Sequence, residues 1–298
     1  MHYRALGKTG LNVSEVGMGC NRFGDPMHSD DHWDDLVRKA VDLGVNIFDT
    51  SEAYEKGRSE EVLGRAVGNR DDVYIASKVS PKGGSVTRDI IVEGAEKSLK
   101  RLKRDVIDVF QLHSPKRDAL ERDNWVEGLT QLRDQGKIRF CAVATGGMVD
   151  ATWLVKEGFA EVLQITYNIF SIAPEDDLFG LAQEYGVGLL ARMPIERGIL
   201  TGKFRPGQEV ANEHRASREG ERLAGKVERA EDLRSLGEGY PGGMTRMALQ
   251  FSLGHPAVSA IIPGARTFEQ LEENVAASYG GDFSSEVRAK IDAIRAQW

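Results

Sequence analysis

The chain of 298 residues is predicted to fold as a (β/α)8 TIM barrel, which is an α/β architecture. Two observations predict this fold. Short apolar runs alternate with amphipathic stretches, giving eight strand–helix pairs. No strong change in composition divides the chain. We therefore expect one domain spanning residues 1–298, an ordinary length for a single barrel.

The expected strands are apolar runs, and the helices between them show apolar residues at helical spacing. Trp125, Leu129 and Leu132, for example, would lie on one helical face. Glycine residues, which suit a left-handed cap, follow the helices expected at 31–43, 124–135, 149–157 and 174–185. The strands are expected at residues 13–19, 46–49, 73–78, 108–113, 138–144, 161–166, 188–193 and 258–262. The other helices are expected at residues 59–67, 87–103, 245–253 and 267–277.

Two segments lie outside this alternation. Residues 2–13 are expected to form an N-terminal β-hairpin that turns at Lys8-Thr9-Gly10 and caps the bottom of the barrel. Residues 205–243 form a long excursion of mixed charge after the seventh strand. A loop of this length on the ligand-binding face is more often a lid or a binding loop than a linker.

The composition excludes several classes of function. A net charge of −7 argues against nucleic acid as the main partner. No apolar run approaches the roughly 20 residues that would span a bilayer, and the N-terminal residues lack the apolar core of a signal peptide. We therefore expect a cytoplasmic protein that acts on a small molecule. The sequence does not indicate its oligomeric state.

No metal site is expected. Cys20 and Cys141 are too few for a cysteine metal site or a disulfide framework. His28 and His32 are four residues apart, as helical zinc ligands can be, but no cysteine or third histidine is near. We interpret these two histidines as part of the solvent-exposed N-terminal end of a helix.

Two glycine motifs resemble nucleotide-binding loops but lack required residues. Gly7-Lys8-Thr9 is similar to the end of a phosphate loop, yet His2 stands where a glycine is required. The Gly-x-Gly at residues 17–19 begins a dinucleotide fingerprint, yet Arg22 occupies the third glycine position. We therefore expect neither a phosphate loop nor a Rossmann domain.

Four chemically active side chains stand at or just past the ends of expected strands: Asp49, Tyr54, Lys78 and His113. The carboxyl ends of parallel strands are where barrels bind ligands. A Lys–Asp pair beside a tyrosine is expected to lower the phenol pKa from about 10 towards neutrality, which would make Tyr54 a proton donor. Taken singly, each residue has an ordinary structural explanation. Asp49 could cap a loop, and Tyr54 could be a loop aromatic. Lys78 could be a solvent-exposed strand end, and His113 could bond a local carbonyl.

The chain resembles the aldo-keto reductase family almost from end to end. The matching motifs are RALGKTGLNVS at 4–14, GMG at 17–19, NIFDTSEAY at 46–54, GRSEEVLG at 57–64, QITYN at 164–168, PIERGILTGK at 194–203, IPGAR at 262–266 and EN at 273–274. The resemblance implies a metal-free barrel that binds NADPH or NADH. It further implies that Tyr54 donates a proton, that Lys78 and Asp49 lower the Tyr54 pKa, and that His113 orients the carbonyl.

The same resemblance implies the cofactor contacts. Gln164 would read the nicotinamide carboxamide, and residues 194–203 would cover the pyrophosphate with backbone N–H groups and an ammonium. The expected cofactor-binding residues are Gly19, Cys20, Asn21, Asp49, Thr145, Gly146, Gln164, Arg192, Met193, Pro194, Ile195, Gly198, Leu200, Gly202, Lys203, Pro263, Gly264, Ala265, Arg266, Gln270, Glu273 and Asn274.

Several of these positions depart from the family pattern. Thr145-Gly146 replaces a Ser-Asn pair, and Arg192 replaces a tyrosine that stacks under the nicotinamide. Gly264 and Gln270 stand where well-studied members have the lysine and arginine that grip the 2′-phosphate, so Arg266 is the nearby cationic candidate. With Arg266 beside a helix N-terminus, we expect NADPH to be preferred and NADH to be possible.

The predicted function is an oxidoreductase that reduces an aldehyde or ketone, or acts in reverse on a sugar or secondary alcohol. Few aromatic residues are available to form the apolar pocket wall that a steroid-like substrate would need. A small polar carbonyl compound or a sugar is therefore favoured as the substrate. One alternative is a non-catalytic cofactor sensor, similar to the channel-associated relatives of the family. A metal-dependent barrel lyase or hydrolase is the other.

Overall fold

The eight parallel strands of the chain form the predicted barrel. The computed structural model describes the backbone of residues 1–207, 213–281 and 283–298, and the side chains of these residues except 213–222. The strands pair in chain order. They are β3 (Met18–Gly19), β4 (Ile47–Asp49), β5 (Tyr74–Val79), β6 (Ile107–His113), β7 (Ile138–Ala144), β8 (Val162–Thr166), β9 (Gly188–Arg192) and β10 (Ala260–Ile261).

Two parallel bridges close the sheet between its first and last strands. Val16 pairs with Ile261, and Gly19 pairs with Gly264. The backbone N–H of Gly17 donates to the Ile261 carbonyl at 2.8 Å. A Cβ at Gly19 would lie 2.8 Å from the Ile262 carbonyl oxygen, so the closure requires glycine at this position.

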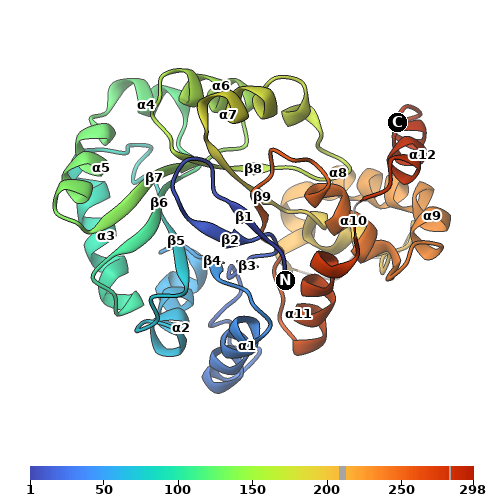
Figure 1. Ribbon diagram of the computed structural model, residues 1–298, viewed down its shortest axis with the longest axis horizontal. Helices are drawn as coiled ribbons and strands as arrows, with labels where there is room; N and C mark the ends of the chain where they lie inside the picture. The colour runs from blue at the N-terminus through green and yellow to red at the C-terminus, as the bar shows by residue number, and fades with distance from the viewer. Residues whose placement is uncertain (208–212, 282) are drawn as a thin grey trace.

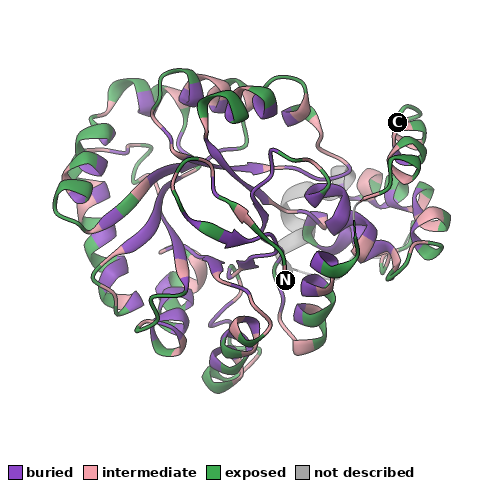
Figure 2. Ribbon diagram, in the orientation of Figure 1, coloured by how far each residue is buried: buried purple, intermediate pink, exposed green. Residues whose placement is uncertain are grey.

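The predicted helices surround the strands (Figure 1). Their buried faces point to the strands and their exposed faces point outward (Figure 2). They are α1 (Asp30–Asp42), α2 (Arg58–Ala66), α3 (Arg88–Leu102), α5 (Trp125–Asp134), α6 (Met148–Lys156), α7 (Leu178–Tyr185), α10 (Gly243–Leu253) and α11 (Phe268–Val275).

The N-terminal hairpin lies across one end of the barrel, as predicted. Its strands β1 (Tyr3–Ala5) and β2 (Asn12–Ser14) pair antiparallel. Leu6, Leu11 and Val13 pack in one buried cluster with a single inward residue from each of seven barrel strands. The hairpin therefore seals the barrel interior, and this sealed end is opposite the carboxyl ends of the strands.

The expected strand at 13–19 is wrong in extent. Asn12–Ser14 belongs to the hairpin, and the barrel strand is only Met18–Gly19. The side-chain amide oxygen of Asn46 accepts from the Ser14 N–H at 2.6 Å, and the Glu15 N–H donates to the His2 carbonyl. These bonds hold the hairpin end against the barrel, and the chain enters the sheet only after it.

Several helices were not predicted individually. They are α4 (Arg117–Arg122), α12 (Ser285–Arg295) and the short η1 (Tyr54–Gly57), η2 (Ala173–Glu175), η3 (Glu196–Thr201) and η4 (Ala276–Tyr279). The predicted excursion at 205–243 contains α8 (Glu213–Asp232) and α9 (Arg234–Glu238), while its residues 208–212 lie outside the described residues. Among the described helices, none combines the length and the apolar character that a membrane span requires.

Candidate active site

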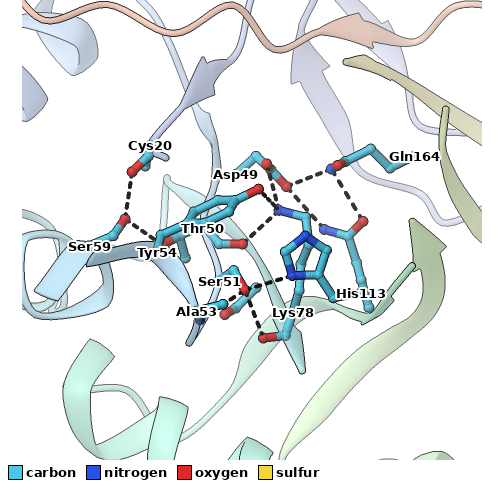
Figure 3. A network of polar contacts seen from close by, with 12 residues as sticks. Cys20, Asp49, Thr50, Ser51, Ala53, Tyr54, Ser59, Lys78, His113 and Gln164 are labelled. Atoms are coloured by element: carbon cyan, nitrogen blue, oxygen red, sulfur yellow. Dashed lines mark hydrogen bonds and ion pairs between the residues drawn. The ribbon is translucent and has the colours of Figure 1, made fainter. Parts of the chain in front are cut away.

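The four predicted catalytic side chains meet at the carboxyl ends of three adjacent strands (Figure 3). Asp49 ends β4, Lys78 lies near the end of β5, His113 ends β6, and Tyr54 begins η1 in the loop after β4. The Lys78 ammonium donates to Asp49 Oδ2 at 2.7 Å, to the Thr50 carbonyl at 2.8 Å and to the Tyr54 hydroxyl oxygen at 3.2 Å. The ammonium thus links the carboxylate to the phenol.

The Lys78–Asp49 pair is almost completely buried, with side-chain exposures of 0% and 4%. Burial alone would lower the pKa of Lys78, but Asp49 and then Tyr54 favour the charged form, so its pKa is raised. A fixed positive charge therefore lies beside the phenol across the whole neutral pH range.

The predicted decrease in the Tyr54 pKa is wrong. Burial of the ring is the largest effect and raises the pKa above 10, and the opposing influence of Lys78 is smaller. The phenol is therefore protonated at neutral pH. Its oxygen accepts from Lys78, while its hydrogen has no acceptor among the described residues.

His113 lies beside the phenol as a neutral imidazole. Its ring meets the Tyr54 ring edge to face, with centroids 5.7 Å apart. Burial and then the nearby Lys78 lower its pKa from 6.5 to about 4. Its Nδ1 lies 3.1 Å from the Ser51 Oγ and 3.4 Å from the Ser80 Oγ.

Sequence reasoning missed the role of Gln111 in this network. Gln111 pairs with Lys78 across the β5–β6 ladder and is fully buried. Its Nε2 donates to Asp49 Oδ1 at 3.1 Å, and the Gln164 Nε2 donates to the same oxygen at 2.7 Å. A polar residue two positions before His113 in an apolar strand was the available signal, because it lies on the same inward face.

Gln164 is thus held by the Asp49 carboxylate. Its Nε2 also lies 3.4 Å from the Gln111 Oε1. The amide oxygen of Gln164 has no partner among the described residues, so it is the atom that stays available to a ligand's N–H group.

Arg192, at the end of β9, places a guanidinium near the same site. Its Nε donates to the Thr166 Oγ1 at 3.2 Å, and its Nη2 lies 3.4 Å from where a Cβ at Gly146 would be. Burial lowers its pKa, while the charges of Tyr54 and Asp49 favour its cationic form. The glycine at 146 therefore leaves room for the guanidinium.

The loop after β9 has an unusual backbone. Met193, Glu196 and Arg197 have positive φ of 59°, 43° and 54°, a region that is costly for residues other than glycine. Buried Glu196 accepts from Asn168 Nδ2 at 2.9 Å and from the Lys226 ammonium of α8 at 2.9 Å. These contacts hold the loop, and they tie the described part of the excursion to it.

Other predicted residues of this loop line the same turn. A Cβ at Gly198 would lie 3.2 Å from the Lys203 Nζ, so the glycine lets the ammonium lie across the turn. Leu200 is buried, and Gly202 ends η3 with a positive φ of 75°. Pro194 and Ile195 connect β9 to η3.

The loop after β10 holds the predicted adenosine contacts close together. The Arg266 N–H donates to the Gln270 Oε1 at 2.9 Å, and the Asn274 Nδ2 donates to the Gly264 carbonyl at 3.3 Å. Pro263 and Ala265 are buried in this loop, and Glu273 is an exposed residue of α11. The start of α11 is already capped in part, because Thr267 Oγ1 accepts from the Gln270 N–H.

One of the two histidines near the start of α1, His32, also touches this loop. His32 Nε2 lies 2.8 Å from the Arg266 carbonyl oxygen, and the His28 and His32 rings stack with centroids 4.0 Å apart. Their interpretation as a merely solvated helix start is therefore incomplete. Among the described residues, no three His, Cys, Asp or Glu side chains lie together where they could hold a metal ion.

The residues predicted in the first barrel loop differ in their exposure to solvent. The Cys20 thiol is buried, and burial followed by the Asp49 charge raises its pKa well above the usual value. Its backbone oxygen accepts from the Ser59 hydroxyl. Asn21 is exposed, and its Oδ1 lies 3.4 Å from where a Cβ at Gly264 would be. Thr145, at the end of β7, is buried and its Oγ1 accepts from the Gly147 N–H.

Comparisons with known proteins identify the family of the chain. Residues 15–296 match the model of the Aldo/keto reductase family. The chain is 31% identical over 291 residues to the uncharacterized oxidoreductase YqkF of Bacillus subtilis (strain 168), covering 93% of this chain and 91% of the relative. It is 30% identical to a putative voltage-gated potassium channel subunit beta of Schizosaccharomyces pombe, covering 98% and 92%.

The fold also matches a solved structure. The aldo-keto reductase AKR11C1 from Bacillus halodurans, in its holo form, superposes with a TM-score of 0.84 at 27% identity. The match covers 99% of this chain and 96% of that chain.

Proposed function

The chain belongs to the aldo/keto reductase family, and we propose that it is an NAD(P)(H)-dependent oxidoreductase that reduces an aldehyde or ketone to an alcohol. The reverse reaction on a sugar or secondary alcohol uses the same groups. The observation that carries the proposal is the Tyr54 phenol, whose oxygen accepts from a buried ammonium and whose hydrogen has no acceptor among the described residues.

Tyr54 is the proposed proton donor. When a hydride adds to the carbonyl carbon, the carbonyl oxygen becomes an alkoxide, which is a much stronger base than a phenolate. Proton transfer from Tyr54 is therefore favourable even though burial raises the phenol pKa. The phenolate that remains is stabilised by the Lys78 ammonium at 3.2 Å, and Asp49 holds that ammonium in place. A positioned acid of this kind typically accelerates a reaction about 10²–10⁴-fold.

His113 is proposed to orient the substrate. Its ring is neutral at pH 7, because its pKa is about 4, so it offers a hydrogen bond without adding a second cation. With Tyr54 edge to face against it, the two side chains supply two donors to one carbonyl oxygen.

The cofactor, when bound, supplies the hydride. The residues that fit it come from strand β8 and from the loops after β9 and β10. The amide oxygen of Gln164 suits the carboxamide, and Lys203 above Gly198 suits the pyrophosphate. Arg266 and its neighbours after β10 suit the adenosine end, so NADPH is the proposed cofactor, with NADH as a weaker one.

The proposal is tested by mixing the purified protein with NADPH or NADH and a panel of aldehydes, ketones and sugars, and following cofactor absorbance. We expect turnover with at least one small polar carbonyl. Tyr54→Phe should lower kcat at least about a hundredfold and leave cofactor affinity nearly unchanged. A Tyr54→Phe protein with near-normal turnover would exclude Tyr54 as the donor.

A non-catalytic cofactor-binding subunit is the second candidate, because relatives described as potassium channel subunits are about as similar as the oxidoreductase relative. The protonated Tyr54 beside a buried Lys78–Asp49 pair favours the enzyme, since a sensor needs no proton donor. Tight cofactor binding with no carbonyl turnover across the panel would favour the sensor.

A further inference from the structure

The Nδ1 atom of His113 faces two serine hydroxyls. The Ser51 Oγ lies 3.1 Å away and the Ser80 Oγ lies 3.4 Å away. Ser51 is fully buried in the loop after β4, and Ser80 follows β5 directly. The opposite ring nitrogen, Nε2, is turned towards the Tyr54–Lys78 side of the site (Figure 3), and it has no hydrogen-bond partner among the described residues.

The hydrogen bonds around Ser51 indicate which way its hydroxyl points. Its Oγ already accepts from the Ala53 N–H at 3.2 Å, so the hydroxyl has one hydrogen left to donate. The two atoms within reach of this hydrogen are His113 Nδ1 at 3.1 Å and the Lys78 carbonyl oxygen at 3.4 Å. Nδ1 is nearer, and the Lys78 carbonyl already accepts from the Glu52 N–H, so the geometry favours Nδ1 as the acceptor of the Ser51 hydrogen.

A neutral imidazole has one N–H and one lone pair, and the partner of one nitrogen determines the state of the other. We propose that Ser51 and Ser80 fix the tautomer of His113 by donating to Nδ1, so that the ring carries its proton on Nε2. This inference rests on the proposed function for its consequence, which is that Nε2–H donates to the substrate carbonyl oxygen.

The other tautomer would weaken carbonyl binding. With the proton on Nδ1, the ring would donate to Ser51, and the Nε2 lone pair would face the lone pairs of the carbonyl oxygen. Ser51 and Ser80 therefore act as positioning residues. They touch neither substrate nor cofactor, and they act through His113.

The tautomer can be measured without any substrate. In ¹⁵N-labelled protein at pH 7, long-range ¹H–¹⁵N correlation separates protonated from unprotonated ring nitrogens. The chain has 6 histidines, so the set of signals that disappears in His113→Asn identifies this ring. We expect a protonated Nε2 and an unprotonated Nδ1, and a mixture of both tautomers in the double variant Ser51→Ala/Ser80→Ala.

Ser59→Ala is the matched control. Ser59 is also fully buried, and its hydroxyl bonds Thr50 and the Cys20 carbonyl in the same region without touching His113. This control removes one buried hydroxyl, so it should keep the wild-type tautomer. A protonated Nδ1 in the wild-type protein, or the same signals in the double variant as in the wild type, would overturn the inference.

Kinetics add a second readout. With any carbonyl that the wild-type protein reduces, the double variant should lose about tenfold in kcat/KM, the value of one well-placed hydrogen bond, while the cofactor Kd stays unchanged. If no carbonyl is reduced, the proposed function fails, yet the NMR result still decides the tautomer. An unchanged kcat/KM in a double variant with a mixed tautomer would refute its role in catalysis.

Discussion

Replacing Lys78 with methionine is expected to destabilise the folded protein by about 3–5 kcal/mol. The side chains of Lys78 and Asp49 are buried, and their charged atoms are 2.7 Å apart. Methionine fills a similar volume but leaves the Asp49 carboxylate inside the protein without its counter-charge. The destabilisation therefore comes mainly from the stranded carboxylate and much less from lost packing.

The structure sets the size of this effect. At 2.7 Å and an effective dielectric constant of about 20, the direct attraction is roughly 6 kcal/mol. The variant keeps part of the solvation of the carboxylate, because the Gln111 and Gln164 amides still donate to its other oxygen. The loss should thus be smaller than the direct attraction and within the range seen for broken buried pairs.

A double-mutant cycle isolates the pair. Asp49→Asn in the Lys78→Met background removes the stranded charge, so the double variant should be more stable than the sum of the single variants predicts, by at least about 2 kcal/mol. Equilibrium urea unfolding gives the four free energies. Additive single effects would refute the argument that the two charges are energetically coupled.

Turnover gives an independent test of the same pair. Lys78→Met should abolish most carbonyl reduction, because the phenolate of Tyr54 loses its neighbouring cation. Asp49→Asn should reduce it less, since the ammonium remains. Full activity in Lys78→Met would show that the pair only stabilises the fold.

The remaining predictions concern His113, the cofactor and the loop after β9. The folded-state pKa of His113 is about 4 against 6.5 for a free side chain, so the wild-type protein should lose up to about 3 kcal/mol relative to His113→Asn as the pH falls from about 6.5 to 4. Urea unfolding at several pH values measures this, and parallel pH profiles would contradict it. Arg266→Ala should weaken NADPH binding about tenfold or more and leave NADH binding almost unchanged. Fluorescence titration measures both affinities, and equal weakening would show that Arg266 does not hold the 2′-phosphate. Lys226→Met should raise the Kd of either cofactor several-fold, because buried Glu196 loses its ion pair and the loop after β9 loses its anchor. Lys226→Arg is the control that keeps the charge, and an unchanged Kd in Lys226→Met would sink this role for α8.

The sequence predicted the barrel and the grouping of the four candidate catalytic side chains because both depend on local rules. Strand ends can be recognised from apolar runs, and parallel strands bring their carboxyl ends to one edge. Asp49, Lys78 and His113 could therefore be placed together without knowing the register. Gln111 could not, since its contact with Asp49 follows from its pairing with Lys78 across the ladder.

Other misses have similar physical causes. The strand expected at 13–19 was placed by its apolar pattern, but Asn12–Ser14 pairs antiparallel with Tyr3–Ala5 and therefore belongs to the hairpin. Helix α12 was not predicted, although the sequence carries a helix signal there. Ser284 is a serine at the N-cap position, and Ile291 is the buried residue of the helix. Helix α4 has six residues, too few for a periodic pattern to stand out.

The error over the Tyr54 pKa shows how the charges of this site are arranged. The strand-end positions in the sequence predicted a phenol beside an ammonium, and that pair alone would lower the pKa of Tyr54. The fold buries the ammonium with Asp49 and buries the phenol as well, so desolvation becomes the larger effect. The two ions, Lys78 and Asp49, thus form the buried part of the site. The two neutral side chains, Tyr54 and His113, lie beside them. Both side chains keep one protonation state across the neutral pH range. In the proposed reaction, the phenolate left by proton transfer would therefore lie beside a cation that is already in place.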